Sequence, residues 1–449
     1  MTLVPQTAES AARALAITGF ALVLAQPLAR LLAHTHGRRR TLAWALLLAP
    51  LLTPALLVSY AYSHIALRLM AVPGGSAALY AVALVLKLTP VAAVIAHFIP
   101  PALSAEAAHC HALLAGPRWR RWVFRLRGAG RAPWMAGGIV FLLAFTDFEL
   151  ASLWSLKTWT VALFDAQAGG LALGASLRLA ALPLAIEIAA LAVLLRRAEF
   201  PAALSAEPKA HTAAAHRALT AYLAGAALLG CVVPLGLIAA PAAAGLRTIA
   251  ENFVLTRELI ASAAFALGAA LGAWPLAAWI ARRRGLALAL CLPGLTGAML
   301  LALFVLTAFQ RPPLRAAYDT PLPLLLALTL LLLPLAVPLR WLLDTARRDP
   351  ALHLARLAGA REVIWRLDTR RRWLAAFLLF CWAYFDCTAS SLLAPVGLTP
   401  VFARLHNLAH YGQTAVLSAM LLGAAAVPVL ALMLTWVARK ALGAMTNDE

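Results

Sequence analysis

Acidic side chains in strongly apolar surroundings are the residues of this sequence best placed to do chemistry. Asp147 and Glu149 follow the apolar run that ends at Thr146, and Asp386 follows a second such run. A carboxylate inside a membrane is costly, and it usually faces a cavity or a bonding partner. Two interpretations stay open. The carboxylates line a path for a cationic solute, or each one hydrogen-bonds within its own part of the chain, for example to Thr146 or Tyr384.

Other ionisable groups give weaker indications. Lys87 and Glu187 also lie in apolar runs and could pair with each other or extend to the membrane surface. His406 and His410 stand four positions apart, a spacing that puts two imidazoles on one helical face, as a zinc site needs. No glutamate follows His406, so the zinc-peptidase pattern fails and an ordinary outer loop is favoured. We predict no metal site and no catalytic residue on this chain.

Nucleotide chemistry is also missing from the sequence. The chain contains no Gly-Lys dipeptide, so it has no P-loop and is not expected to hydrolyse ATP by that route. No converging set of nucleophile, base and acid predicts an enzyme. The five cysteines form no CxxC pair, and most of them stand in apolar runs, so we expect buried small residues rather than a disulfide framework.

The composition places these residues in a lipid bilayer. Hydrophobic residues make up 63% of the 449 residues, charged residues make up 12%, and the mean hydropathy is +0.84. A soluble domain is about half apolar and a quarter charged. The net charge of +20 indicates membrane topology rather than nucleic-acid binding, because Lys and Arg accumulate in cytoplasmic loops. The first apolar run is too long for a cleavable signal.

Stretches of roughly 20 apolar residues predict eleven spanning helices. They cover about 12–33, 42–64, 76–100, 133–156, 171–195, 217–241, 258–281, 285–309, 321–341, 373–395 and 414–438. With the N-terminus outside, the inner loops carry 28 basic residues and the outer loops nine. This positive-inside bias predicts that the loops 103–131 and 342–371 are cytoplasmic.

The sequence repeats itself between its two halves. Gln26-Pro27-Leu28-Ala29 and Trp274-Pro275-Leu276-Ala277 each lead to three consecutive arginines, and Leu114-Ala115-Gly116 corresponds to Leu357-Ala358-Gly359. We therefore predict an all-α polytopic membrane protein of two homologous modules in a parallel repeat, an arrangement typical of solute transporters. The first module covers 1–197, a cytoplasmic linker covers 198–216, and the second module covers 217–449. The helix at 217–241 is extra and precedes the second five-helix core.

The two cytoplasmic loops share a local pattern. In the second loop Asp349-Pro350 is suited to a helix start, with Asp as the cap and Pro in the first turn. Gly359 is suited to the end of that helix. A short amphipathic helix is therefore expected between two spans, followed by basic residues.

This pattern resembles the cytoplasmic loop of binding-protein-dependent ABC importer permeases, which reads Glu-Ala-Ala, three residues, Gly, and later Leu-Pro. The residues that the resemblance assigns to ATPase coupling are Glu106, Ala107, Ala108, Ala115, Gly116, His353, Ala355, Ala358 and Gly359. The chain departs from the family at three points. His353 replaces the family's Glu, Glu106 lies four residues too early, and the Leu-Pro ending is absent from both loops.

The resemblance extends over nearly the whole chain, and two fused modules are similar to the ferric-iron and thiamine branch of the family. It implies the type I importer fold, with separate ABC ATPase subunits, in two copies, that carry ATP and Mg. It also implies a solute-binding protein as partner, an inner-membrane location in bacteria, and iron(III) or a thiamine-like solute as substrate. No nucleic acid and no cofactor on this chain are expected. The alternative is a secondary transporter driven by an ion gradient, which predicts paired Gly/Pro interruptions in its helices.

Overall fold

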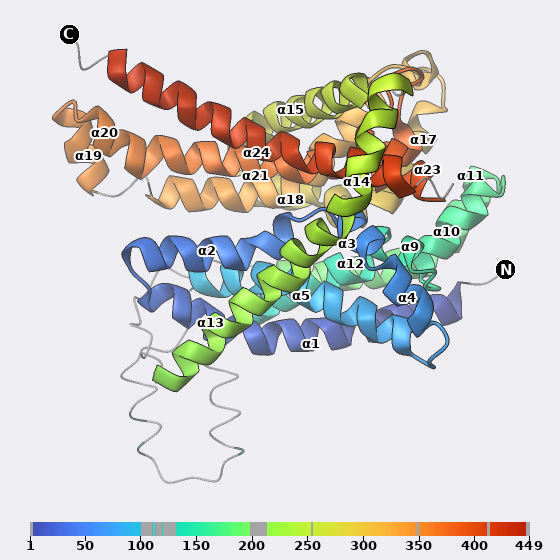
Figure 1. Cartoon of the computed structure of the whole chain (residues 1–449), viewed down its shortest axis with the longest axis horizontal. Coiled ribbons are helices and arrows are strands. Elements are labelled where there is room, and N and C mark those ends of the chain that lie inside the picture. The colour runs from blue at the N-terminus through green and yellow to red at the C-terminus, as the bar shows by residue number, and fades with distance from the viewer. Residues whose placement is uncertain are drawn as a thin grey trace. The chain divides into compact units, whose positions relative to one another are not determined.

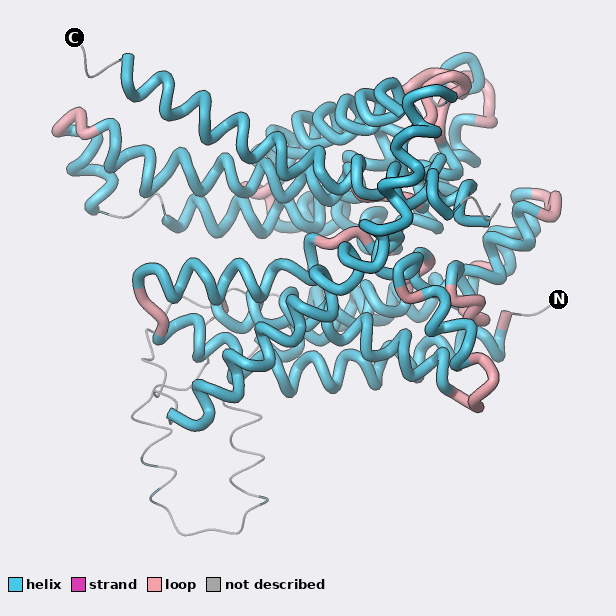
Figure 2. The backbone as a smooth tube through the Cα atoms, in the orientation of Figure 1, coloured by secondary structure: helices cyan, strands magenta, loops and turns pink. Residues whose placement is uncertain are grey.

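A computed structural model describes residues 3–99, 110, 113, 119, 132–197, 213–252, 255–346, 350–410 and 414–445. Every regular element in these residues is a helix, and none is a strand (Figure 2). Seven described helices are long and apolar enough to cross a membrane, and two bent helix pairs raise the number to nine. The chain is therefore an all-α polytopic protein, as its composition predicted.

The remaining two predicted spans are present as interrupted helices. Over 171–195 the chain forms α11 (Leu173–Leu179) and α12 (Ala181–Arg197), and over 373–395 it forms α21 (Arg370–Tyr384) and α22 (Thr388–Leu393). Each of these helices is shorter than the roughly 20 residues that a spanning helix needs. The count of eleven spans therefore stays a prediction.

The helices belong to two compact units (Figure 1). Unit 1 contains Met1–Thr53, Tyr62–Pro234 and Leu295–Met299, and unit 2 contains Pro54–Ala61, Leu235–Gly294 and Leu300–Glu449. Each unit thus includes a short segment from the other half of the chain. Both segments begin at a helix break: Pro54 follows α2 (Gly37–Leu52), and Leu295 ends α16 (Arg284–Leu295).

In unit 1, α1 (Val4–His34) is the central helix and packs along α5 (Gly75–Phe98) and α8 (Ala132–Phe145). Its buried face repeats every three or four residues and includes Ala14, Ile17, Ala21, Ala25 and Leu28. Small side chains allow neighbouring helices to approach closely inside a membrane. Large apolar side chains on its other face are exposed, as expected against lipid; they are Leu15, Phe20 and Val23.

Shorter helices complete unit 1. They are α4 (Ser63–Leu69), α9 (Glu149–Leu153), α10 (Trp159–Ala168) and α13 (Ala213–Ala227), together with α2, α11 and α12. The predicted extra helix at 217–241 is longer than expected and is interrupted by a π-helical turn at Leu228–Val232. Its first part, α13, packs on α2 and α1 within unit 1.

In unit 2, α15 (Leu255–Ile280) is the central helix and packs along α18 (Leu322–Ala346) and α21. Its buried face is also rich in small residues, among them Ala266, Ala269, Ala273 and Ala277. The other elements are α3 (Ala55–Ala61), α14 (Val233–Asn252), α16, α17 (Gly297–Phe309), η2 (Leu314–Ala317), α19 (Pro350–Leu357), α20 (Arg361–Ile364), η3 (Trp365–Thr369), α22, α23 (Val401–His410) and α24 (Thr414–Met445).

Two helix pairs are bent by more than 40°, α2 with α3 and α16 with α17. Prolines explain both breaks, because Pro50 and Pro54 flank the first break and Pro293 precedes the second. Gly294, next to that proline, lies so close to the Leu330 carbonyl oxygen that a Cβ atom at this position would overlap it. Gly297 starts α17 with a φ of +81°, a left-handed conformation that favours glycine.

Candidate functional site

The short helix predicted in the second cytoplasmic loop is present as α19. It begins at Pro350, where a missing N–H costs nothing, and it ends at Leu357. Gly359 has a φ of +64°. The Ala360 N–H donates to the Ala355 carbonyl oxygen (2.9 Å), and the Gly359 N–H donates to that of Arg356 (3.3 Å). These two bonds form a Schellman motif, which stops the helix and turns the chain.

The α19 helix has a buried face and an exposed apolar face. Leu352 and Ala355 are buried. Leu354 is 64% exposed and Leu357 is 73% exposed, and Ala358 and Gly359 beyond them are also exposed. We call these four residues, 354, 357, 358 and 359, the α19 end surface. Leu354 and Leu357 thus leave apolar side chains exposed at the end of α19.

Asp368 joins α19 to the start of α21. One carboxylate oxygen, Oδ2, lies 2.9 Å from Nη2 of Arg356 on α19, and the other, Oδ1, lies 2.7 Å from Nε of Arg372 on α21. The Asp368 side chain is 11% exposed. It belongs to η3, a π-helical turn that leads into α21. Asp368 was not among the predicted site residues. It stands in Leu367-Asp368, which replaces the Leu-Pro ending of the importer loops, and a missing motif assigns no role to a residue.

The coupling residues predicted in the first loop lie outside the described residues. They are Glu106, Ala107, Ala108, Ala115 and Gly116. In the second loop His353 is exposed and Ala355 is buried, and Ala358 and Gly359 form the end of the helix. The structure therefore brings the second set together on α19, and their role in coupling stays a prediction.

Asp147 lies in a break of the predicted fourth span, between α8 and α9. The backbone N–H groups of Leu150 and Ala151 and the Tyr80 hydroxyl face its carboxylate, whose buried Oδ2 atom has no hydrogen-bond partner among the described residues. The Lys87 ammonium interacts electrostatically with Asp147 and with Glu149, which occupies the first turn of α9. A negative charge is favourable at the start of a helix.

Asp386 occupies the corresponding break in unit 2, between α21 and α22. The Ser390 N–H donates to its Oδ2 atom (2.9 Å), and the Ala389 N–H also hydrogen-bonds to its carboxylate. Each aspartate thus faces the N–H groups three and four positions further on, at the start of a short helix, and for Asp386 the bond from Ser390 is formed. In a membrane this matters because water cannot satisfy the exposed N–H groups.

Thr146 and Tyr384, the hydrogen-bond partners suggested from the sequence for these carboxylates, do not bond to them among the described contacts. Thr146 instead donates its hydroxyl to the Leu142 carbonyl oxygen (2.8 Å). The Tyr384 hydroxyl is buried with no hydrogen-bond partner among the described residues. Both aspartates face the start of a short helix, and Asp147 also faces Tyr80 and Lys87. A position for either aspartate on a solute path stays a prediction.

Lys87 bonds to the backbone at the end of α2 in unit 1. Its Nζ atom donates to the Thr53 carbonyl oxygen (2.6 Å) and lies 3.5 Å from that of Leu51. These carbonyl groups end α2 and have no further helical turn to bond to. The possible ion pair between Lys87 and Glu187 is not formed, because Lys87 bonds to the end of α2 instead.

Each capped helix is followed by a second short helix that a serine holds at its start. In unit 1 the Trp159 N–H, at the start of α10, donates to the Ser10 hydroxyl (3.3 Å). In unit 2 the Val401 N–H, at the start of α23, donates to the Ser262 hydroxyl (2.6 Å). Both serines lie on the central helix of their unit, α1 and α15. In both units, therefore, a serine on the central helix accepts a hydrogen bond from the backbone at the start of the second short helix.

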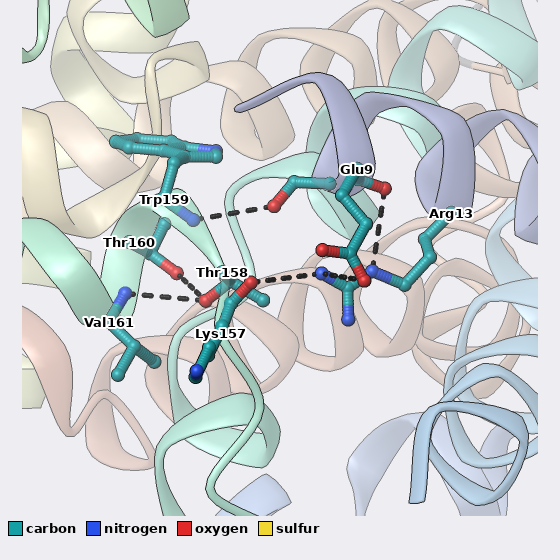
Figure 3. Close-up of polar contacts among 8 residues, drawn as sticks. Glu9, Arg13, Lys157, Thr158, Trp159, Thr160 and Val161 are labelled. Atoms are coloured by element: carbon teal, nitrogen blue, oxygen red, sulfur yellow. Dashed lines mark hydrogen bonds and ion pairs between the residues drawn. The ribbon is translucent and has the colours of Figure 1, made fainter. Parts of the chain in front are cut away.

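Further polar contacts surround the start of α10 (Figure 3). Thr158 caps α10 by accepting from the Val161 N–H (3.3 Å), and its hydroxyl lies 2.8 Å from that of Thr160. Thr160 donates to the Asp147 carbonyl oxygen (2.8 Å). Figure 3 also shows Arg13 of α1, which donates to the Lys157 carbonyl oxygen (3.0 Å). Thr160 thus fixes the backbone at Asp147, and Arg13 fixes the backbone just before α10.

Glu187 on α12 is fully buried, and neither carboxylate oxygen has a hydrogen-bond partner among the described residues. A buried polar group without a partner costs about 1–3 kcal/mol. Glu187→Leu is therefore expected to raise the thermal unfolding midpoint of the detergent-purified chain by several degrees, measured by intrinsic fluorescence. Glu187→Gln keeps a polar group and should change the midpoint less. A lower midpoint for Glu187→Leu would show that the carboxyl group has a stabilising partner.

Histidine and cysteine form no metal cluster in the part of the chain that the structure describes. No group of three or more His, Cys, Asp or Glu residues there is arranged to hold an ion. His406 lies buried in α23, between α22 and the start of α24, rather than in an exposed loop. The expectation of an ordinary outer loop at this position was wrong, because α23 packs on α15 and α24.

No protein-family model matches the chain, and no curated protein and no solved structure matches it either. The class that the fold defines is an all-α polytopic membrane protein. What it does must be argued from its own two units: from α19, from the capped breaks at Asp147 and Asp386, and from the bent helix pairs.

Proposed function

We propose that this chain is the membrane permease subunit of an ATP-driven importer, bound on its cytoplasmic side by separate ATPase subunits. The observation that carries the proposal is α19. It is a short helix between two spans, anchored through Leu352 and Ala355, ended by Gly359, and exposing the leucines of its end surface. A helix that a partner pushes or pulls needs this combination of a fixed inner face and a free apolar end.

The proposal includes the finer architecture of eleven spans in two homologous modules. Support comes from the matching devices in the two units. Asp147 and Asp386 cap short helices through the same two positions, and Ser10 and Ser262 hold the next short helix. The repeat implies a second docking point in the loop 103–131. Closure of two ATPase subunits would then switch the modules between inward-facing and outward-facing states.

The solute is proposed to be a small cation, iron(III) or a thiamine-like molecule, delivered by a separate solute-binding protein. This part follows from the resemblance of the fused modules to that branch of the importer family. ATP and Mg would be held by the partner subunits, and the location would be the bacterial inner membrane.

A secondary transporter is the second candidate, and one observation favours it. The bent pairs α2/α3 and α16/α17 interrupt corresponding helices of the two halves at Pro and Gly residues. Transporters driven by ion gradients place their solute sites at such paired interruptions. This candidate gives α19 no function, which is why we rank it second.

Affinity purification of the tagged chain from its native membranes in mild detergent tests the proposal. We expect an ATPase to be recovered in a ratio of two subunits per chain, together with ATP hydrolysis by the recovered complex. Recovery of the chain without any stoichiometric ATPase would contradict the proposal. Sensitivity of uptake to a protonophore under conditions that preserve ATP would then support the secondary transporter.

A further inference from the structure

Asp368 is the point where the α19 helix is tied to a spanning helix. Its two carboxylate oxygens accept hydrogen bonds from two different elements. Arg356 of α19 donates to Oδ2, and Arg372 of α21 donates to Oδ1. Distances of 2.9 Å and 2.7 Å between nitrogen and oxygen are those of charge-assisted hydrogen bonds. A carboxylate held on both sides cannot rotate toward one arginine without lengthening its bond to the other.

We propose that Asp368 is a positioning residue that makes α19 and α21 move as one body, so that a force on α19 reaches the membrane. The inference rests on the proposed function, because that function supplies the force. The inference goes beyond the proposed function because it assigns the transmission of this force to one carboxylate. In the resemblance to importer loops, Leu367-Asp368 stands in place of the family's Leu-Pro ending, and no role was assigned to Asp368.

The ion pair adds a directional, charged link to the apolar packing of Leu352 and Ala355, the buried residues of α19. Among the described residues, the bond from Arg356 to Asp368 is the ion pair that joins α19 to another element. From α20 the chain continues through η3 into α21 as one uninterrupted helical stretch over 361–384. Ala358, Gly359 and Ala360, the residues of the Schellman turn, separate α19 from this stretch. The bond from Arg356 to Asp368 joins the two helices across this turn, which could otherwise act as a hinge.

The far end of α21 shows what the movement would reach. The helix runs unbroken for 15 residues to Tyr384, which at 1.5 Å per residue is about 22 Å. Two residues later Asp386 caps α22. A displacement of α19 that is passed to α21 would therefore arrive at the break where α22 begins, within the same unit.

The burial of Asp368 makes the link more than a surface ion pair. Exposed pairs contribute little because water and salt screen them. The Asp368 side chain is only 11% exposed, whereas Asp344, which pairs with Arg340 on α18 at 3.5 Å, is 47% exposed. Asp344 thus offers a matched control: a more exposed acidic residue paired with an arginine four positions away on α18.

The first experiment uses the purified full-length chain and needs no partner. Amide hydrogen exchange over 350–360 is compared in the unsubstituted chain and in Asp368→Asn, Arg356→Lys and Asp344→Asn. Asp368→Asn should accelerate exchange in this segment at least tenfold. Arg356→Lys keeps the charge and should stay within about threefold of the unsubstituted chain, as should Asp344→Asn. Equal exchange in Asp368→Asn and the unsubstituted chain would overturn the proposal.

The second experiment uses the complex with its ATPase and separates transmission from stability. Cys387, which is buried beside Asp386 at the start of α22, is the reporter. Its rate of alkylation by N-ethylmaleimide is measured by mass spectrometry with and without ATP. We expect a change of at least threefold in the unsubstituted chain and in Arg356→Lys. Asp368→Asn should bind the ATPase but abolish the change.

The outcomes distinguish this proposal from the proposed function. If no ATPase is recovered with the unsubstituted chain, the proposed function fails, and the exchange experiment alone decides whether Asp368 fixes α19. If the ATPase is recovered and Cys387 responds to ATP equally in Asp368→Asn and the unsubstituted chain, the transmission through Asp368 is wrong. An absent response in the unsubstituted complex overturns it as well.

Discussion

Gly359→Val is expected to lower the recovery of the ATPase with the tagged chain at least tenfold, while the chain itself remains folded. Gly359 has a φ of +64°, and a side chain in this left-handed region costs about 1–2 kcal/mol. No atom lies within 4 Å of a Cβ built at this position, so the effect comes from the backbone and not from a clash. The valine would unmake the Schellman turn and redirect the α19 end surface. The measurement is the molar ratio of ATPase to chain after purification, together with ATP hydrolysis.

Gly74→Val is the matched control for this experiment. Gly74 has a φ of +75° and likewise has no atom within 4 Å of a built Cβ, but it lies before α5 in unit 1. Its substitution introduces the same backbone strain away from α19, and ATPase recovery should stay within about twofold of the unsubstituted chain. Gly359→Asn should also retain recovery, because asparagine tolerates the left-handed region. Equal losses in Gly359→Val and Gly74→Val would mean that general instability is responsible.

The helix α19 could be predicted from sequence because its limits are local. Pro350 fits only a first helical turn, and Gly359 supplies the conformation that ends a helix, so two residues define the element without any tertiary contact. The break positions of the spans were predicted less well. The prolines were visible, but the predicted spans ran through them, because apolar composition continues across a break and gives no sign of it.

The contacts of the candidate site depend on tertiary structure, and the sequence did not predict them. Asp368 and Arg356 are separated by twelve positions, and they meet because the chain turns at Gly359, between α19 and α20. The pairing of Lys87 was predicted wrongly for a related reason. The sequence shows which charges are buried, but not that the carbonyl groups ending α2 are near Lys87.

The equivalence of Asp147 and Asp386 was predictable, and their bonding was not. Their correspondence follows from the repeat, whereas capping requires the span to be broken just before each aspartate. An Asp two residues before a helix is a recognisable signal only once that helix is known to start there. The same limit explains why Ser10 and Ser262 were missed, since each bonds to a backbone N–H well over a hundred positions away.

Asp386→Ala is expected to destabilise the chain strongly, whereas Asp386→Asn is expected to be tolerated. Alanine leaves the N–H groups of Ala389 and Ser390 without their buried acceptor, and each unpaired group costs about 1–3 kcal/mol. Asparagine keeps an acceptor oxygen in the same place. The thermal unfolding midpoint should fall clearly for Asp386→Ala and by at most a few degrees for Asp386→Asn.

The same pair of variants separates capping from a role on the solute path. If Asp386 only caps α22, Asp386→Asn should retain ATP-dependent uptake once the solute is known from its binding protein. If the carboxylate binds a cationic solute, Asp386→Asn should stay folded but lose most of its uptake. The capping contacts favour the first result, and a tenfold loss of uptake in a stable Asp386→Asn chain would contradict it.

Asp147→Asn should cost more stability than Asp386→Asn although the two positions correspond, because Lys87 faces Asp147. Removing the Asp147 charge takes one of two acidic neighbours from the buried Lys87 ammonium, and Glu149, the other neighbour, should limit the loss of stability. Adding Lys87→Met should recover part of the loss, so that the double variant is more stable than the sum of the single effects predicts. Thermal unfolding of the two single variants and the double variant measures this coupling. Strictly additive effects would mean that Lys87 serves only the carbonyl groups at the end of α2, and that its charge does not stabilise the capped break.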